Sequence, residues 1–91
     1  MAEVKAIGVL ETRGFVPLIE GADAAVKAAS VDVIEWRLVG SGFVSFVIEG
    51  EVSAVRSAID AGKESASKVG EVISDLVIPR PVDEIKTTFK S

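Results

Sequence analysis

The side chains of this chain that could do chemistry are few, and most of them are carboxylates. Five of them could supply an acid–base pair: Glu11, Glu20, Asp23, Glu35 and Glu49. Their spacing singles out no pair, and carboxylates at this density usually form a solvated face. The chain has no histidine, tyrosine or cysteine, so it lacks the commonest proton-transfer side chain and every thiolate metal ligand. We therefore predict that the chain is not an enzyme and holds no metal ion or cofactor.

The tripeptide Gly40-Ser41-Gly42 lies between two strongly apolar runs, residues 31–39 and 43–48. Two such runs joined by a short glycine-rich link predict a β-hairpin, because glycine reaches the positive φ values of a tight turn. The tip of this hairpin offers backbone N–H groups and one hydroxyl with little bulk. On a monomer it would be a plain turn, whereas in a symmetric ring it would repeat around an axis and line an opening. The tripeptide alone favours the plain turn.

The composition predicts an oligomer of identical chains. The chain has 91 residues, enough for one domain, and 48% of them are hydrophobic. A domain of this size cannot bury so much apolar surface within itself. No run approaches the roughly 18 to 20 apolar residues of a membrane helix. We therefore expect the surplus apolar surface to be buried between copies of the chain rather than in lipid.

The charge argues against a nucleic-acid partner. Fourteen acidic residues against ten basic ones give a net charge of −4, with no basic cluster. The first five residues lack the basic-then-apolar order of a signal peptide, and the absence of cysteine fits the cytosol. We expect a cytoplasmic protein that binds neither nucleic acid nor membrane.

The apolar periodicity predicts the order β-α-β-β-α-β-α. The expected strands cover residues 4–12, 31–39, 43–48 and 71–78, and the expected helices start near residues 15, 51 and 83. Pro17 fits only the first turn of the first helix, and Gly70 fits the end of the second. This order predicts an α+β fold in which helices cover one face of a mainly antiparallel four-stranded sheet, as in a split βαβ unit. We expect one domain, 1–91, with a short tail helix from about residue 83.

Three apolar stripes are expected to form the core. The first helix contributes Phe15, Leu18, Ile19, Ala22, Val26 and Ala29, the second Val52, Val55, Ile59, Ala66 and Val69, and the fourth strand Val72, Leu76 and Ile78.

Several segments, in this order, resemble the hexamer-forming shell proteins of bacterial microcompartments. These proteins are the tiles of carboxysomes and of the propanediol- and ethanolamine-utilising organelles. The segments that carry the resemblance are residues 6–14, 22–29, 40–42, 50–55, 60–62, 69–71 and 77–81. Each segment alone is a weak signal, but their joint occurrence in about 90 residues is specific.

The resemblance implies a cyclic homohexamer that packs edge to edge into sheets within the shell, in the bacterial cytoplasm. Gly40, Ser41 and Gly42 match the turn that lines the central pore for small polar metabolites. Lys27 and Arg80 match residues at the contact between neighbouring hexamers. Other shell proteins are then the expected partners, with encapsulated enzymes or their targeting peptides as further candidates.

Three positions of this chain differ from residues that are common in this family, and a fourth carries its only tryptophan. Leu38 stands where many relatives carry a lysine, which removes a candidate ring of positive charge near the opening. Ser30 and Val82 replace residues common at the tile edge. Trp36, the only tryptophan, is expected to pack on the sheet face or at a subunit interface rather than stack on a ligand.

A small ligand-sensing module of the ferredoxin-like, ACT-type class is the alternative function. Such domains also use a β-α-β-β-α-β order, oligomerise, and bind an amino acid or nucleotide at a subunit seam. Against this alternative, the hairpin is too short to fold over a ligand, and no phosphate-cradling loop precedes a helix.

Overall fold

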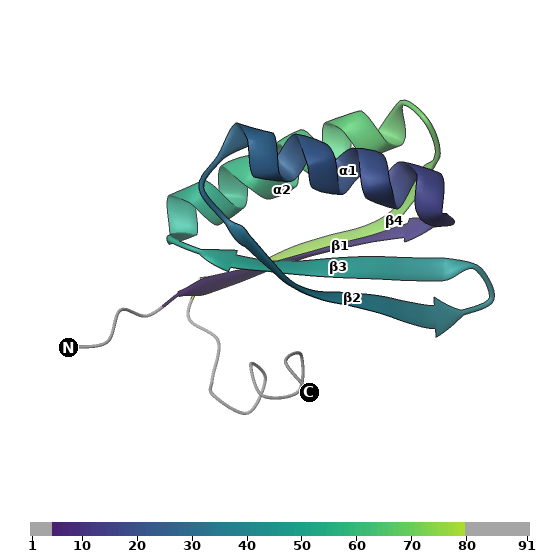
Figure 1. Ribbon diagram of the computed structural model, residues 1–91, viewed down its shortest axis with the longest axis horizontal. Helices are drawn as coiled ribbons and strands as arrows, with labels where there is room; N and C mark the ends of the chain where they lie inside the picture. Colours follow the sequence, from purple (N-terminus) through teal and green to yellow (C-terminus); the bar gives the residue numbers. More distant parts are fainter. Residues whose placement is uncertain (1–4, 80–91) are drawn as a thin grey trace.

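Two helices lie side by side on one face of a four-stranded antiparallel sheet in the computed structural model of this chain (Figure 1). The structure describes residues 5–79. The elements are β1 (Ala6–Arg13), α1 (Phe15–Ala28), β2 (Asp32–Gly40), β3 (Phe43–Gly50), α2 (Val52–Ser67) and β4 (Glu71–Ile78). The strand order is β2-β3-β1-β4, so β2 and β4 are the two edges. The predicted α+β fold is confirmed, and the expected tail helix lies outside the described residues.

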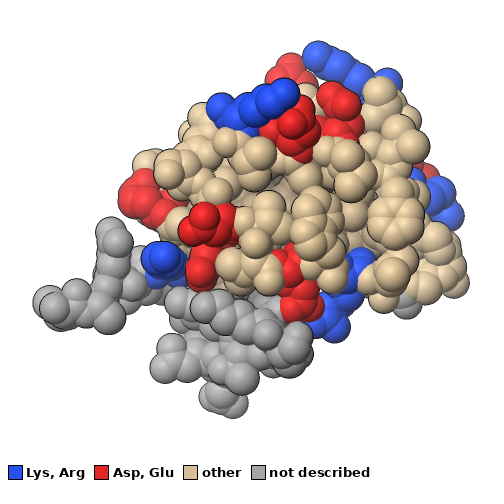
Figure 2. Space-filling model, viewed as in Figure 1, with Lys and Arg blue, Asp and Glu red and all other residues tan. Residues whose placement is uncertain are grey.

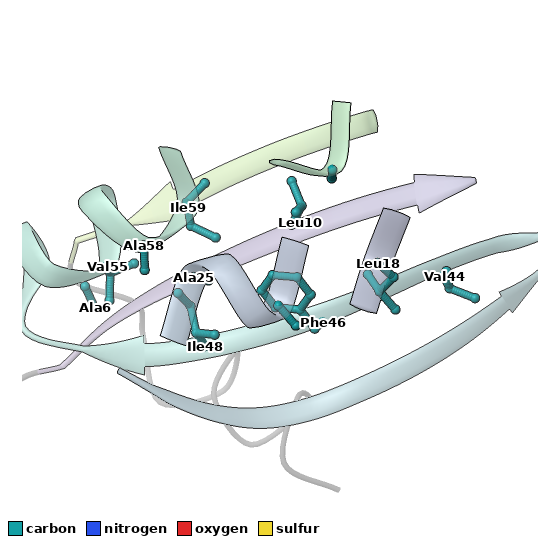
Figure 3. Close-up of a cluster of buried hydrophobic side chains, with 12 residues drawn as sticks. Ala6, Leu10, Leu18, Ala25, Val44, Phe46, Ile48, Val55, Ala58 and Ile59 are labelled. Carbon is teal, nitrogen blue, oxygen red and sulfur yellow. The ribbon is translucent and has the colours of Figure 1, made fainter. Parts of the chain in front are cut away.

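The core lies between the helices and the sheet face that they cover (Figure 3). Successive strand residues point to opposite faces, so alternate residues of β1 and β3 turn toward the helices. The largest of these side chains, Leu10 and Phe46, are fully buried. Residues from both helices and the two central strands complete the cluster: Ala6, Leu18, Ala22, Ala25, Val44, Ile48, Val55, Ala58, Ile59 and Ala66.

The two helices approach so closely that their backbones touch. A Cβ atom placed on Gly62 of α2 would lie 2.8 Å from the carbonyl oxygen of Gly21 in α1. A Cβ atom placed on Gly21 would lie 3.1 Å from the carbonyl oxygen of Gly62. Glycine at both positions is therefore what allows this crossing of α1 and α2.

The stripe predicted for α1 is wrong at three of its larger residues, Phe15, Ile19 and Val26. Leu18 and Ala22 are buried as expected, and they share the buried face with smaller residues such as Ala25. Phe15 and Ile19 are each 55% exposed, and Val26 is also exposed. The close contact with α2 demands small side chains on the buried face, so α1 is rotated to turn its bulky apolar residues outward.

The apolar face predicted for β4 is wrong because the strand contains a β-bulge. Thr12 of β1 pairs with Val72, but its neighbour Glu11 pairs with Ser74, so Ile73 is the extra residue. A bulge of this kind reverses the alternation of side chains beyond it. Val72 and Val77, five residues apart, therefore both pack against the core, whereas Leu76 is 54% exposed. The stripe predicted for the second helix is buried or partly buried at Val52, Val55, Ile59 and Ala66 of α2. Its last member, Val69, lies beyond the end of α2 and is exposed.

Candidate functional site

The tip of the β2–β3 hairpin is a run of three residues in the left-handed region. The φ angles are 109° at Gly40, 57° at Ser41 and 83° at Gly42. The predicted glycine-rich turn is confirmed. Ser41 is the only non-glycine residue with positive φ within residues 5–79, a conformation that costs an L-residue free energy. Strained residues of this kind concentrate at functional sites, so the exposed Ser41 is a candidate for a role beyond the turn.

The hairpin tip is tied to the beginning of α1. The backbone N–H of Gly14 donates a hydrogen bond to the carbonyl oxygen of Gly42 at 2.7 Å. The buried hydroxyl of Thr12 donates to the carbonyl oxygen of Gly14 at 3.0 Å. Because Gly14 directly precedes α1, the tip lies at the N-terminal end of this helix, as Figure 1 shows.

A second contact holds the base of the tip on the sheet face away from the helices. The guanidinium of Arg13 lies 4.8 Å from the ring centre of Phe43, a cation–π distance. The Nε atom of the same arginine donates to Glu71 Oε1 at 2.9 Å. Residues from β1, β3 and β4 thus hold one another where the hairpin leaves the sheet.

Lys27 lies at the other end of α1, in its last turn. Its Nζ atom is 2.9 Å from Asp23 Oδ2, and its side chain is 74% exposed. The hydrogen bond from Lys27 to Asp23 and the charge of that carboxylate raise the pKa of the lysine, so it is protonated at neutral pH. A helix of fourteen residues is about 20 Å long, which separates Lys27 from the hairpin tip. Arg80 and Val82 lie outside the described residues, and Ser30 is exposed just beyond α1.

An apolar surface runs along α1 between these two ends. We call it the flank patch, and it consists of Phe15, Val16, Ile19 and Val26 of α1 with Trp36 of β2, all exposed. Figure 2 shows a broad area without charged side chains over α1 and the hairpin, bordered by charged groups. The ring of Trp36 packs on Phe46 with 5.9 Å between centroids, which confirms its expected place on the sheet face. Its outer side is open to a partner.

The flank patch was not predicted from the sequence as an exposed surface. The signal was present, because α1 carries more large apolar residues than one buried stripe can hold. Leu18 supplies the buried stripe, and Phe15, Ile19 and Val26 are the surplus.

The carboxylates considered for catalysis are scattered over the surface and the sheet. Asp23 pairs with Lys27, Glu35 with Arg37, and Glu11 accepts a hydrogen bond from the Ser74 hydroxyl. Within residues 5–79, no three acidic, histidine or cysteine side chains are grouped as a metal site would require. None of the helices in the same part of the chain is long and apolar enough to cross a membrane.

A comparison with models of known protein families shows to which family this chain belongs. A model of the BMC domain matches residues 6–81. The chain belongs to the BMC domain family. This is the family of bacterial microcompartment shell proteins, for which hexamers and a central pore are typical. The predicted identity as a structural shell protein rather than an enzyme is confirmed, and nothing in the comparisons favours the ACT-type alternative.

Curated BMC domain proteins are similar to this chain over most of their length. The shell protein EutM of Salmonella typhimurium is 42% identical over 86 residues, which cover 94% of this chain and 90% of EutM. PduA of Citrobacter freundii is 44% identical over 82 residues, covering 90% and 88%. The carboxysome protein CcmK2 of Thermosynechococcus vestitus is 43% identical over 83 residues, covering 89% and 81%.

A crystal structure of a microcompartment protein from Desulfitobacterium hafniense has the same BMC domain fold. It matches with a TM-score of 0.84 and 34% identity, over 97% of this chain. The chain spans about half the length of that protein, since the match covers 48% of it.

Proposed function

We propose that this chain is a non-catalytic tile that closes into a cyclic homohexamer and joins other shell proteins in the wall of a bacterial microcompartment. The single observation that supports this best is the apolar flank patch, which runs between the hairpin tip and Lys27. In a ring, the tip lies near the axis, the flank patch lies in the seam between protomers, and Lys27 lies at the perimeter. Encapsulated enzymes or their targeting peptides are further proposed partners.

A cyclic ring of identical chains requires two different surfaces on each protomer that fit one another. The flank patch lies toward the β2 edge of the sheet. Exposed apolar side chains also occur at the opposite edge, where Ile73 and Leu76 lie on β4. We propose that the occupant of the flank patch is a second copy of this chain. Burial of Phe15, Ile19 and Trp36 in each seam accounts for the high apolar content of a protein this small.

The hairpin tip supplies the chemistry proposed for the pore. Six copies would place Gly40, Ser41 and Gly42 around one axis and present a ring of hydroxyl and backbone N–H groups. Such a ring replaces part of the hydration of a small polar molecule, as polar groups in selective pores do. The glycines carry no side chain, and apart from their chain neighbours no atom of residues 5–79 lies within 4 Å of a Cβ atom placed at Gly40 or Gly42, so the tip itself adds no bulk at the axis.

The test of the proposed function is the mass of the purified chain and its state under the electron microscope. We expect light scattering to give a mass near six chains at micromolar concentration, with sheets or tubes in concentrated samples. The emission of Trp36 is expected to shift to the blue as the chain assembles, because its half-exposed ring enters a seam. A stable monomer contradicts the proposal, and a discrete dimer or trimer without sheets favours a ligand-sensing oligomer.

Lys27→Ala is expected to leave the hexamer intact and to reduce sheet formation. Among residues 5–79 the lysine pairs with Asp23 on its own helix, and its exposed ammonium group can reach across a tile edge. Its loss removes six edge contacts per tile, and because each tile is held in the sheet by many weak contacts, the combined loss weakens the whole sheet. The measurement is the fraction of protein pelleted as sheets, with the hexamer checked by light scattering.

Lys63→Ala is the matched control for Lys27→Ala. Lys63 is an exposed lysine of α2 that pairs with Asp75, as Lys27 pairs with Asp23. The control is expected to form sheets as the wild type does. Monomers in the Lys27→Ala sample would show that Lys27 belongs to the seam within the ring instead of the tile edge.

A further inference from the structure

Leu38 is the most exposed large hydrophobic residue of the described chain. Its exposed fraction is 74%, and it lies on β2 only two residues before the hairpin tip. It pairs with Val44 across the hairpin, so its side chain lies on the helix-covered side of the sheet, as Val44 does. Leu38 is therefore an apolar group beside the tip, and the protomer leaves it in water.

The arginines that flank the tip have carboxylate partners. Arg13, at the end of β1, pairs with Glu71 and covers the ring of Phe43. Arg37 precedes Leu38 on the opposite face of the sheet and pairs with Glu35. Glu35 is itself largely buried, with 11% of its side chain exposed, so this pair is held against the sheet. Neither arginine offers the unpaired positive charge that would attract an anion to the tip.

We propose that Leu38 is a specificity-determining residue of the opening, which favours small uncharged molecules over small anions. This inference rests on the proposed ring, in which six copies of Leu38 form an apolar collar at the mouth next to the Ser41 hydroxyls. The substrate class is a small neutral molecule that is polar enough to hydrogen-bond at the tip and tolerates loss of water at the collar.

The physical reason is the difference in the cost of removing water. A neutral hydroxyl or carbonyl group loses a few kcal/mol when it leaves water without a partner, and Ser41 restores one hydrogen bond. Removing an ionised carboxylate from water costs far more free energy, and the leucine side chains of the collar offer no hydrogen bond or charge to offset this cost. Apolar constrictions in channels exclude ions in this way. A lysine at position 38 would instead place six positive charges at the mouth and attract anions.

The test compares the entry of a small anion, lactate, with the entry of a smaller neutral molecule, ethanol, into intact compartments. Shells are produced in a host that expresses this chain as the only hexamer-forming tile, with lactate oxidase or alcohol oxidase encapsulated. Both enzymes need only oxygen besides lactate or ethanol, so oxygen uptake reports entry of the probe. Latency is the rate in broken shells divided by the rate in intact shells.

We expect Leu38→Lys to lower the lactate latency about three- to tenfold and to leave the ethanol latency unchanged. Leu38→Gln, which is similar in size but uncharged, separates the effect of charge from the loss of leucine. It is expected to leave the lactate latency well above that of Leu38→Lys. Equal lactate latencies for Leu38→Lys and Leu38→Gln would overturn the inference.

Ser41→Leu distinguishes failure of the inference from failure of the proposed function. Suppose that Ser41→Leu raises both latencies while the two Leu38 variants have equal lactate latencies. The probes then enter through the opening at the hairpin tip, but Leu38 does not discriminate between anions and neutral molecules. This result would support the proposed pore and contradict the inference about Leu38. If Ser41→Leu changes neither latency, the tip is not the opening, and the proposed pore and the inference are both overturned.

Discussion

Ile19→Glu is expected to convert the hexamer into folded protomers. Ile19 is 55% exposed in the protomer and lies in the middle of the flank patch, so the substitution leaves the core untouched. In the ring, the same position is buried in every seam, and a carboxylate there has no partner. A buried charge without a partner costs about 3 kcal/mol or more, which is roughly a 100-fold weaker association at each seam. A ring contains six seams, so the loss at each seam adds up and the ring dissociates. Light scattering is therefore expected to give the mass of one chain at micromolar concentration.

The control for Ile19→Glu is Ser57→Glu, which adds the same charge at an exposed position of the other helix, α2. This variant is expected to remain a hexamer. Circular dichroism of both variants is expected to match the wild type, because neither residue belongs to the core. A hexamer that persists with Ile19→Glu would show that the flank patch is not the seam and would remove the main support for the proposed ring.

Gly62→Val is expected to destabilise the protomer itself. Even a Cβ atom at this position would come within 2.8 Å of the Gly21 carbonyl oxygen, and a backbone atom cannot move aside as a side-chain end can. The two helices must then separate, and the core side chains beneath them lose contacts. The cost of overpacking is about 3 kcal/mol, a large part of the roughly 5 to 10 kcal/mol that stabilises a small domain.

The measurement for Gly62→Val is the urea midpoint at a fixed protein concentration, because assembly adds to the apparent stability. Ser57→Val, on the exposed side of the same helix, places a valine in α2 without overpacking and is expected to cost little, because serine and valine have similar helix propensities. Equal midpoints for the two variants would show that α1 and α2 can move apart at little cost. That result would contradict the close crossing as a source of stability.

The order and bounds of the elements could be predicted because glycine and proline mark their ends. Pro17 limits α1 to a start near Phe15, and the Gly40–Gly42 turn separates β2 from β3. The face that each element buries was harder to predict. A helix with apolar residues on more than one side has two possible orientations, and the choice at α1 depends on the Gly21–Gly62 contact with a residue 41 positions away.

The bulge at Ile73 could not be read from the sequence for a similar reason. It depends on how β4 pairs with β1, and Val72, Ile73 and Ser74 show no local signal for an extra residue. For the candidate site, the turn at Ser41 was predicted from local residues and is confirmed. The flank patch was not predicted, because Phe15, Ile19 and Val26 were assigned to the core. Surface and core cannot be separated by hydrophobicity alone when a protein also buries surface against itself.

The hydrogen bond from Gly14 to Gly42 fixes the hairpin tip to one end of α1, and Lys27 occupies the other end. In the proposed ring, the aperture of each tile and its outline therefore lie at opposite ends of one helix. Substitutions at positions 38 to 42 can then retune which molecules pass without disturbing how tiles tessellate. Substitutions around position 27 can likewise adapt the wall to new neighbours while its permeability stays the same.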